Sequence, residues 1–193
     1  MAQIFTKIGY RFLLGTIFLT ASQTFSQIDP AVSNRLNGFM RENCTTTFNE
    51  ISSTPVENIL KYKVFHIVQE TQNMYGEKKK NINEFIVIDT GQKVASFERV
   101  QANTSLPELT NYIREDFILD QESAHEFQSL LDYIYPIEYW KPDHREYFQK
   151  NGKWYFLRDA YFRTKQGFEV TVDIQGRITD ICYKMKWNGS ESK

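Results

Sequence analysis

The chain is poor in the residues that carry most metal and nucleophile chemistry. Its 193 residues include three histidines and two cysteines, Cys44 and Cys182, and no CxxC pair is present. Two cysteines so far apart lack the local spacing of a zinc site. The net charge is −1, so no basic excess points to a nucleic-acid partner. We therefore expect no metal, no cofactor and no nucleic acid.

An apolar run near the N-terminus is too short for a membrane span. Phe12–Thr20 follows the basic residues Lys7 and Arg11, and small and polar residues come next, which is the layout of a secretory signal peptide. A spanning helix needs about 20 apolar residues. We predict a signal peptide over 1–26, cleaved after Ser26, and an exported protein, periplasmic or extracellular, with no permanent membrane anchor. An uncleaved anchor or a buried N-terminal helix is the alternative.

Export would place the two cysteines in an oxidising compartment. In an oxidising compartment Cys44 and Cys182 tend to close a disulfide bridge, which makes them a candidate pair. Two separate buried thiols are the equal alternative, because a bridge requires Cα atoms within roughly 7 Å and the sequence does not give that distance.

Residues 27–193 have a length that suits a single domain. Asp29 and Pro30 predict the start of a helix that ends near Glu42. The Thr-, Ser- and Asn-rich segment 43–57 predicts a loop. Two more helices are expected, one starting near Pro107 and one capped by Asp120 and ended by Pro136.

Alternating apolar and polar residues predict strands over 59–71, 84–89 and 93–101, with Lys78–Lys80 at a solvated hairpin tip. In the last third, Asn151-Gly152 predicts a type I′ turn between strands 146–150 and 153–158. Gln175-Gly176 then separates strands 168–174 and 177–187. Residues Gly167–Tyr183 resemble the terminal hairpin of PepSY-type periplasmic domains, which implies a strand, a Gly-containing turn and a second strand.

These elements together predict the α+β class. We expect an antiparallel β-sheet of about 5–7 strands, ending in a C-terminal meander, with two to three helices packed on one face.

One histidine and two carboxylates stand within four residues in the segment Asp143-His144-Arg145-Glu146. Histidine titrates near neutrality and a neighbouring carboxylate can orient it as a general base. His144 with Asp143 or Glu146 is therefore the candidate catalytic group of a small envelope hydrolase. A solvated charged loop is the alternative, because no nucleophile motif such as GxSxG stands nearby.

The other two histidines have simpler interpretations. His125-Glu126 lacks the second zinc ligand at i+4, where Ser129 stands, so His125 is predicted at the solvent edge of a helix. His66 lies on an apolar strand face and is predicted as a core histidine.

Aromatic residues concentrate between Tyr133 and Phe162, and strand alternation cannot point all of them inward. Exposed Tyr and Trp beside a charged loop form a plausible contact surface for another protein or a glycan. The candidate contact residues are Tyr139, Trp140, His144, Tyr147 and Trp154. The alternative is that this segment forms the main core.

We predict from these observations a non-enzymatic binding module, for example an inhibitor or an immunity-type protein. The hydrolase and a structural subunit of an envelope assembly are the alternatives.

Overall fold

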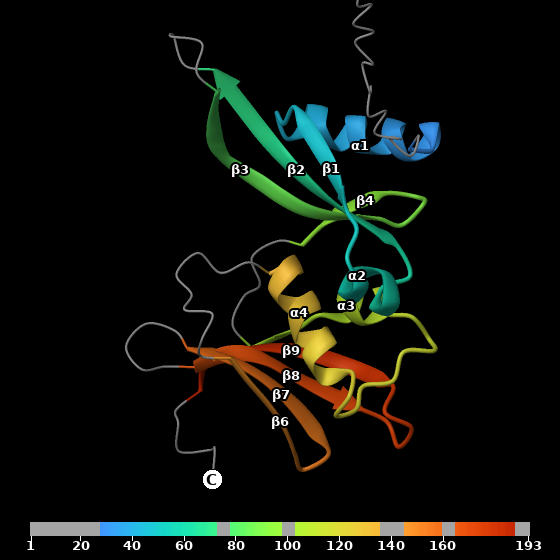
Figure 1. Ribbon diagram of the computed structural model, residues 1–193, viewed down its shortest axis with the longest axis vertical. Helices are drawn as coiled ribbons and strands as arrows, with labels where there is room; N and C mark the ends of the chain where they lie inside the picture. The colour runs from blue at the N-terminus through green and yellow to red at the C-terminus, as the bar shows by residue number, and fades with distance from the viewer. Residues whose placement is uncertain (1–27, 73–77, 98–102, 136–144, 160–164, 188–193) are drawn as a thin grey trace, which may run out of the picture.

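The computed structural model describes residues 28–72, 78–97, 103–135, 145–159 and 165–187. They form two antiparallel sheets and helices, so the predicted α+β class and the C-terminal meander are confirmed (Figure 1). The strands do not form one sheet as expected. Sheet 1 has the order β1-β2-β3-β4, and sheet 2 has the order β5-β9-β8-β7-β6.

The helices of the described residues are α1 (Pro30–Glu42), α2 (Thr54–Ile59), α3 (Pro107–Tyr112) and α4 (Ala124–Ile134). The strands are β1 (Thr47–Ile51), β2 (Lys63–Gln72), β3 (Lys78–Asp89), β4 (Val94–Ser96), β5 (Thr104–Ser105), β6 (Arg145–Lys150), β7 (Lys153–Asp159), β8 (Lys165–Val172) and β9 (Ile178–Trp187).

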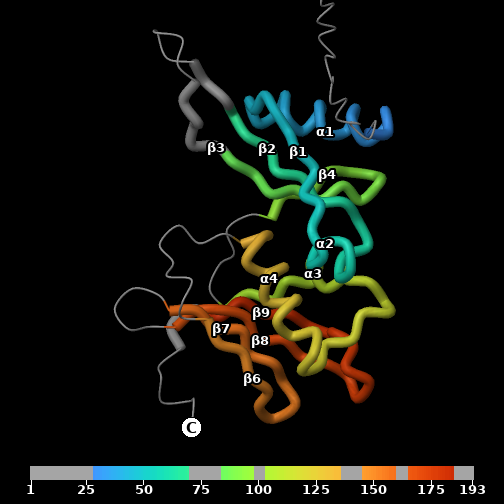
Figure 2. Tube along the Cα trace, viewed as in Figure 1, coloured from blue at the N-terminus to red at the C-terminus, as the bar shows by residue number. Residues whose placement is uncertain are grey.

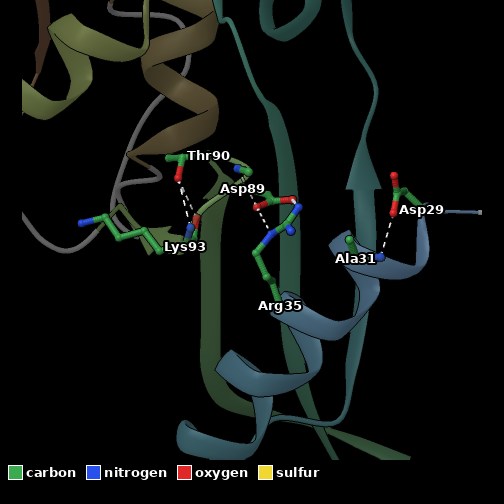
Figure 3. Close-up of polar contacts among 7 residues, drawn as sticks. Asp29, Ala31, Arg35, Asp89, Thr90 and Lys93 are labelled. Atoms are coloured by element: carbon green, nitrogen blue, oxygen red, sulfur yellow. Dashed lines mark hydrogen bonds and ion pairs between the residues drawn. The ribbon is translucent and has the colours of Figure 1, made fainter.

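The first helix begins as its sequence predicts. Asp29 is the N-cap, its Oδ1 accepts the backbone N–H of Ala31 at 2.7 Å, and Pro30 opens the helix. Arg35 then ties α1 to the end of β3, because its Nε and Nη2 each donate to the Asp89 carboxylate at 2.8 Å (Figure 3). The same carboxylate accepts the backbone N–H of Gly91 at 3.0 Å. The side chain of Asp89 is only 4% exposed, so this ion pair anchors the helix from within sheet 1.

The loop predicted over 43–57 is wrong for most of its length. Thr47–Ile51 forms β1, which pairs antiparallel with β2 from Thr47↔Val68 to Ile51↔Val64. α2 follows, with a proline in its first turn. Local composition favours irregular backbone here, but pairing with β2 satisfies the backbone groups of the segment. The long-range pairing therefore overrides the local preference.

The hairpin β2–β3 is longer than its sequence pattern indicates. Lys78–Lys80 does not form the hairpin tip as predicted, because these residues belong to β3 and pair with Glu70, Thr71 and Gln72 of β2. Each added pair continues the ladder of backbone hydrogen bonds, so the strands run beyond the apolar segments that reveal them in sequence.

Helices separate the two sheets. In Figure 2, α2, α3 and α4 lie between sheet 1 and sheet 2, and α1 lies on the other side of sheet 1. One hydrophobic cluster under α1 contains Leu36, Phe65 and Val87. The main cluster joins both sheets through the helices, with Val64 of β2 and Phe168 of β8 among its buried residues. Sheet 1 is thus apolar on both faces, whereas sheet 2 has one face against the helices.

The helices expected after residue 107 are confirmed, with α4 starting later than predicted. Asp120 does accept backbone N–H groups, from Glu122 and Ser123 at 2.9 Å each, and these bonds lower the pKa of Asp120. They close a turn that precedes the helix, which itself begins at Ala124.

Candidate functional site

Strand pairing in sheet 2 divides the aromatic segment between two faces. Side chains alternate along β7, so Trp154, Phe156 and Arg158 share one face and Lys153 and Tyr155 share the other. The first face packs on α4, since Phe156 contacts Phe127 of that helix with ring centroids 5.2 Å apart. The second face points away from α4, and we call it the outer face of sheet 2.

Two residues predicted for the contact surface lie on the inner face. Trp154 is 2% exposed and belongs to the main hydrophobic cluster, so its assignment to a contact surface is corrected: it is a core residue. Tyr147 is half-buried against the same cluster, with its ring 6.1 Å from that of Phe156. Tyr139, Trp140 and His144 lie outside the described residues.

The outer face carries its own aromatic pair. Phe148 of β6 is paired with Tyr155 of β7, and their rings stack at 5.2 Å with an interplanar angle of 23°. The next partners across the sheet are Glu169 on β8 and Cys182 on β9. Both aromatic side chains are half-buried, so part of the stack is open to solvent.

Ion pairs flank this aromatic stack. Lys153 Nζ lies 2.8 Å from Glu169 Oε1, and this hydrogen bond raises the pKa of Lys153. Lys165 pairs with Glu146 at the other end of the same face. The stack and the pairs together form a surface with both apolar and charged groups, as protein interfaces have.

The hydrolase hypothesis has one described residue, Glu146. It lies on the outer face of β6 and pairs with Lys165, while Asp143 and His144 lie outside the described residues. Its geometry therefore stays a prediction. Within the described part of the chain, no three His, Cys, Asp or Glu side chains are grouped to hold a metal ion.

Of the predictions for the other two histidines, one is confirmed and one is wrong. His125 is exposed on α4, as predicted. His66 is not a buried core residue, because its side chain is 30% exposed and its Nε2 lies 3.2 Å from Glu84 Oε2. Val64 and Val68 on the same strand face are buried, whereas the contact with the exposed carboxylate of Glu84 lies at the solvent boundary.

An ionic cluster between α4 and sheet 2 was not predicted from the sequence. Asp132 pairs with Arg158, and its Oδ2 lies 2.9 Å from Arg145 Nη1. Arg158 also donates from Nη1 to the carbonyl of Tyr135 at 3.1 Å. Burial raises the pKa of Asp132, partly offset by the two guanidinium groups, and burial lowers the pKa of Arg158 against the opposing effect of Asp132. The cluster fixes the end of α4 to β6 and β7.

A signal for this cluster exists in the sequence. Arg158 stands at i+2 and i+4 from Phe156 and Trp154, which places it on the apolar face of its strand. A cation on such a face needs a buried carboxylate, because an unpaired buried charge is costly.

The cysteines do not form the candidate bridge in the structure. Both are free thiols. Cys44 follows α1 beside sheet 1 and Cys182 lies on β9 of sheet 2, so the helical layer that separates the sheets also separates the two residues.

Comparisons with protein-family models, curated proteins and solved structures gave no match for this chain. Among the residues described, no helix has the length and hydropathy to cross a membrane. A functional assignment therefore rests on the chemistry of the outer face of sheet 2, which combines stacked rings with ion pairs.

Proposed function

We propose that the chain is an exported, non-enzymatic binding module that contacts a protein partner through the outer face of sheet 2. The observation that carries this proposal is the Phe148–Tyr155 stack, flanked by the Lys153–Glu169 pair on the face opposite the core. It replaces Tyr147 and Trp154 as the described part of the contact surface.

Contact through this surface costs little side-chain entropy. A stacked aromatic pair on a sheet loses little side-chain freedom when a partner covers it, and tyrosine combines an apolar ring with a polar hydroxyl. Such residues dominate the energy of protein interfaces. A protein partner is favoured over a glycan because charged pairs of both signs border the stack, and they complement charges on a protein surface.

The N-terminal sequence supports the part of this proposal that concerns export. Residues 1–26 have the order of a basic start, an apolar run and small residues that is typical of a secretory signal peptide. The partner is then an envelope or extracellular protein, and the inhibitor or immunity-type role is the form of this function that we favour.

The test is capture of the partner by the tagged full-length chain, immobilised and exposed to envelope and extracellular fractions of its source. Wild-type protein is compared with Tyr155→Ala, which removes the tyrosine ring of the Phe148–Tyr155 stack. Tyr133→Ala is the matched control, because Tyr133 is a 44% exposed tyrosine on α4. The proposal expects a stoichiometric protein, identified by mass spectrometry, that Tyr155→Ala loses and Tyr133→Ala retains.

Thermal unfolding of the three proteins accompanies the capture and shows whether each variant is folded. Equal retention by the two variants, or retention of a glycan and no protein, would overturn the proposal.

A further inference from the structure

Strand β6 forms an edge of sheet 2. In the order β5-β9-β8-β7-β6 it is the last strand, and among the described strands only β7 pairs with it. Its six residues make it a longer sheet edge than β5, which has two. An edge of this length presents backbone donors and acceptors to an added strand.

The turn at the end of β6 determines which backbone groups face outward. Asn151 and Gly152 both have positive φ, 53° and 75°, as a two-residue type I′ turn requires. Such a turn is closed by a hydrogen-bonded pair, here Lys150 and Lys153. Hydrogen-bonded and non-hydrogen-bonded pairs alternate along the strand, so the backbone groups of Phe148 face β7, as those of Lys150 do. The backbone groups of Tyr147 and Gln149 therefore face the sheet edge.

This alternation restricts how a second copy of β6 pairs with the first in antiparallel orientation. Residues facing the edge must oppose each other, and the two registers with the greatest overlap place Tyr147 opposite either Tyr147 or Gln149 of the second copy. The register that pairs Tyr147 with Gln149 is distinctive. It places Glu146 opposite Lys150 of the second copy, twice by symmetry, and Phe148 opposite its own copy.

We propose that two copies of this chain associate through β6 in that register, with Phe148 at the two-fold axis and sheet 2 continuous across both. In this register the strand is complementary to itself in charge, because Glu146, which pairs with Lys165 of its own chain, also faces Lys150 of the second copy. The Phe148–Tyr155 stacks of the two copies then meet on one face. This inference does not rest on the proposed function, since it is argued from the backbone of the sheet edge and the charges of β6, although Phe148 belongs to both surfaces.

A cysteine at the two-fold axis tests the register. Opposite residues of a non-hydrogen-bonded antiparallel pair have Cα atoms about 4.5 Å apart, within the range of a disulfide. The full-length chain with Cys44→Ser and Cys182→Ser carries either Phe148→Cys or the neighbouring Gln149→Cys. Under mild oxidation the proposal expects a disulfide-linked dimer from Phe148→Cys on a non-reducing gel. Gln149→Cys opposes Tyr147 of the second copy and is expected to stay largely unlinked.

An equal yield of linked dimer from the two variants would overturn the register. Circular dichroism of both variants before oxidation confirms that each is folded.

Charge reversal tests the interface without cysteines. Sedimentation of the full-length chain is expected to show a dimer, and Lys150→Glu is expected to weaken self-association about tenfold, because it opposes two carboxylates at two symmetric positions. The double variant Glu146→Lys/Lys150→Glu restores opposite charges and the dimer. Lys93→Glu, the same charge change at an exposed residue beside sheet 1, is the control.

A monomeric wild-type chain, or equal effects of Lys150→Glu and Lys93→Glu, would contradict the proposed dimer. A wild-type monomer that still captures its partner through Tyr155 would leave the proposed function standing. Loss of partner capture alone leaves the dimer standing.

Discussion

Two glycines of the described residues stand in opposite surroundings, and they show how position decides the effect of one methyl group. A Cβ on Gly167 of β8 would lie 1.9 Å from the carbonyl oxygen of Phe156 on β7. A Cβ on Gly38 of α1 would meet nothing within 4 Å. Gly167 thus permits close approach of two strands, whereas Gly38 only adds backbone freedom to a helix.

Alanine at the two positions is expected to have effects of opposite sign. Gly167→Ala forces the strands apart and lowers the free energy of unfolding by about 1–3 kcal/mol, as overpacking does. Gly38→Ala raises it by roughly 0.5–1 kcal/mol, because glycine inside a helix is unfavourable relative to alanine. Urea unfolding followed by circular dichroism measures both. A stabilising Gly167→Ala would show that β7 and β8 are not packed as described.

Asp89 is expected to make stability depend on acid pH. The hydrogen bonds from Arg35 hold the pKa of Asp89 below its ordinary value, against the opposing effect of burial. A lowered carboxyl pKa contributes stability above the unfolded value near 4, and that contribution is lost as the pH falls through the folded pKa. Asp89→Asn is therefore less stable than wild type at pH 7 and loses less between about pH 4 and pH 2.

Urea unfolding at pH 7, 4 and 2 checks this expectation. Glu115→Gln changes an exposed carboxylate and serves as the control. Parallel pH profiles for wild type and Asp89→Asn would show that the ion pair with Arg35 does not form in solution.

Neighbouring residues on β7 illustrate what the sequence predicts at the scale of an element. Alternation shows that Trp154 and Tyr155 point to opposite faces, but it does not show which face meets a helix. The partners across the sheet carry that information: Trp154 pairs with Val170, whereas Tyr155 pairs with Glu169. Strand patterns could therefore have identified the inner face once the pairing of β7 with β8 was known.

The same strand patterns could not predict that the strands divide into two sheets. Each strand reveals its own apolar face locally, whereas its neighbours in the sheet depend on contacts between residues far apart in the chain. One local sign was present, since Val64 and Phe65 of β2 are both apolar and lie on opposite faces. A strand covered on both sides fits a sheet that lies between helix layers, as sheet 1 does.

Truncation of the two neighbouring residues is expected to separate core from surface. Trp154→Ala removes a buried ring and lowers the free energy of unfolding by about 3–5 kcal/mol. Tyr155→Ala removes a half-buried ring of the outer face and is expected to cost less than half as much. Denaturant unfolding of both variants checks the difference. A larger loss from Tyr155→Ala would reverse the assignment of inner and outer faces.

The whole molecule is held by a core that crosses from one sheet to the other. Val64 and Ile88 of sheet 1 and Phe156 and Phe168 of sheet 2 belong to one cluster, with Leu131 of α4 between them. Residues of the two sheets therefore depend on the same helices for burial, which supports our proposal that residues 27–193 form a single domain.

Unfolding of such a molecule is expected to be a single transition. Trp154 is buried in the core against sheet 2, and Trp140 and Trp187 also stand in the C-terminal third of the sequence, so the fluorescence of Trp154 reports on sheet 2. Circular dichroism reports on both sheets. The two probes should give coincident urea curves. Separate midpoints would show that sheet 1 and its helix unfold independently of sheet 2.

At this scale we propose that sheet 2 presents a contact surface on the face that its core does not use. The most direct measurement is the dissociation constant between the captured partner and three purified proteins: wild type, Tyr155→Ala and Tyr133→Ala. We expect a dissociation constant at least about tenfold higher for Tyr155→Ala, as for an interface hot spot, and an unchanged value for Tyr133→Ala. An unchanged value for Tyr155→Ala in a folded protein would contradict it.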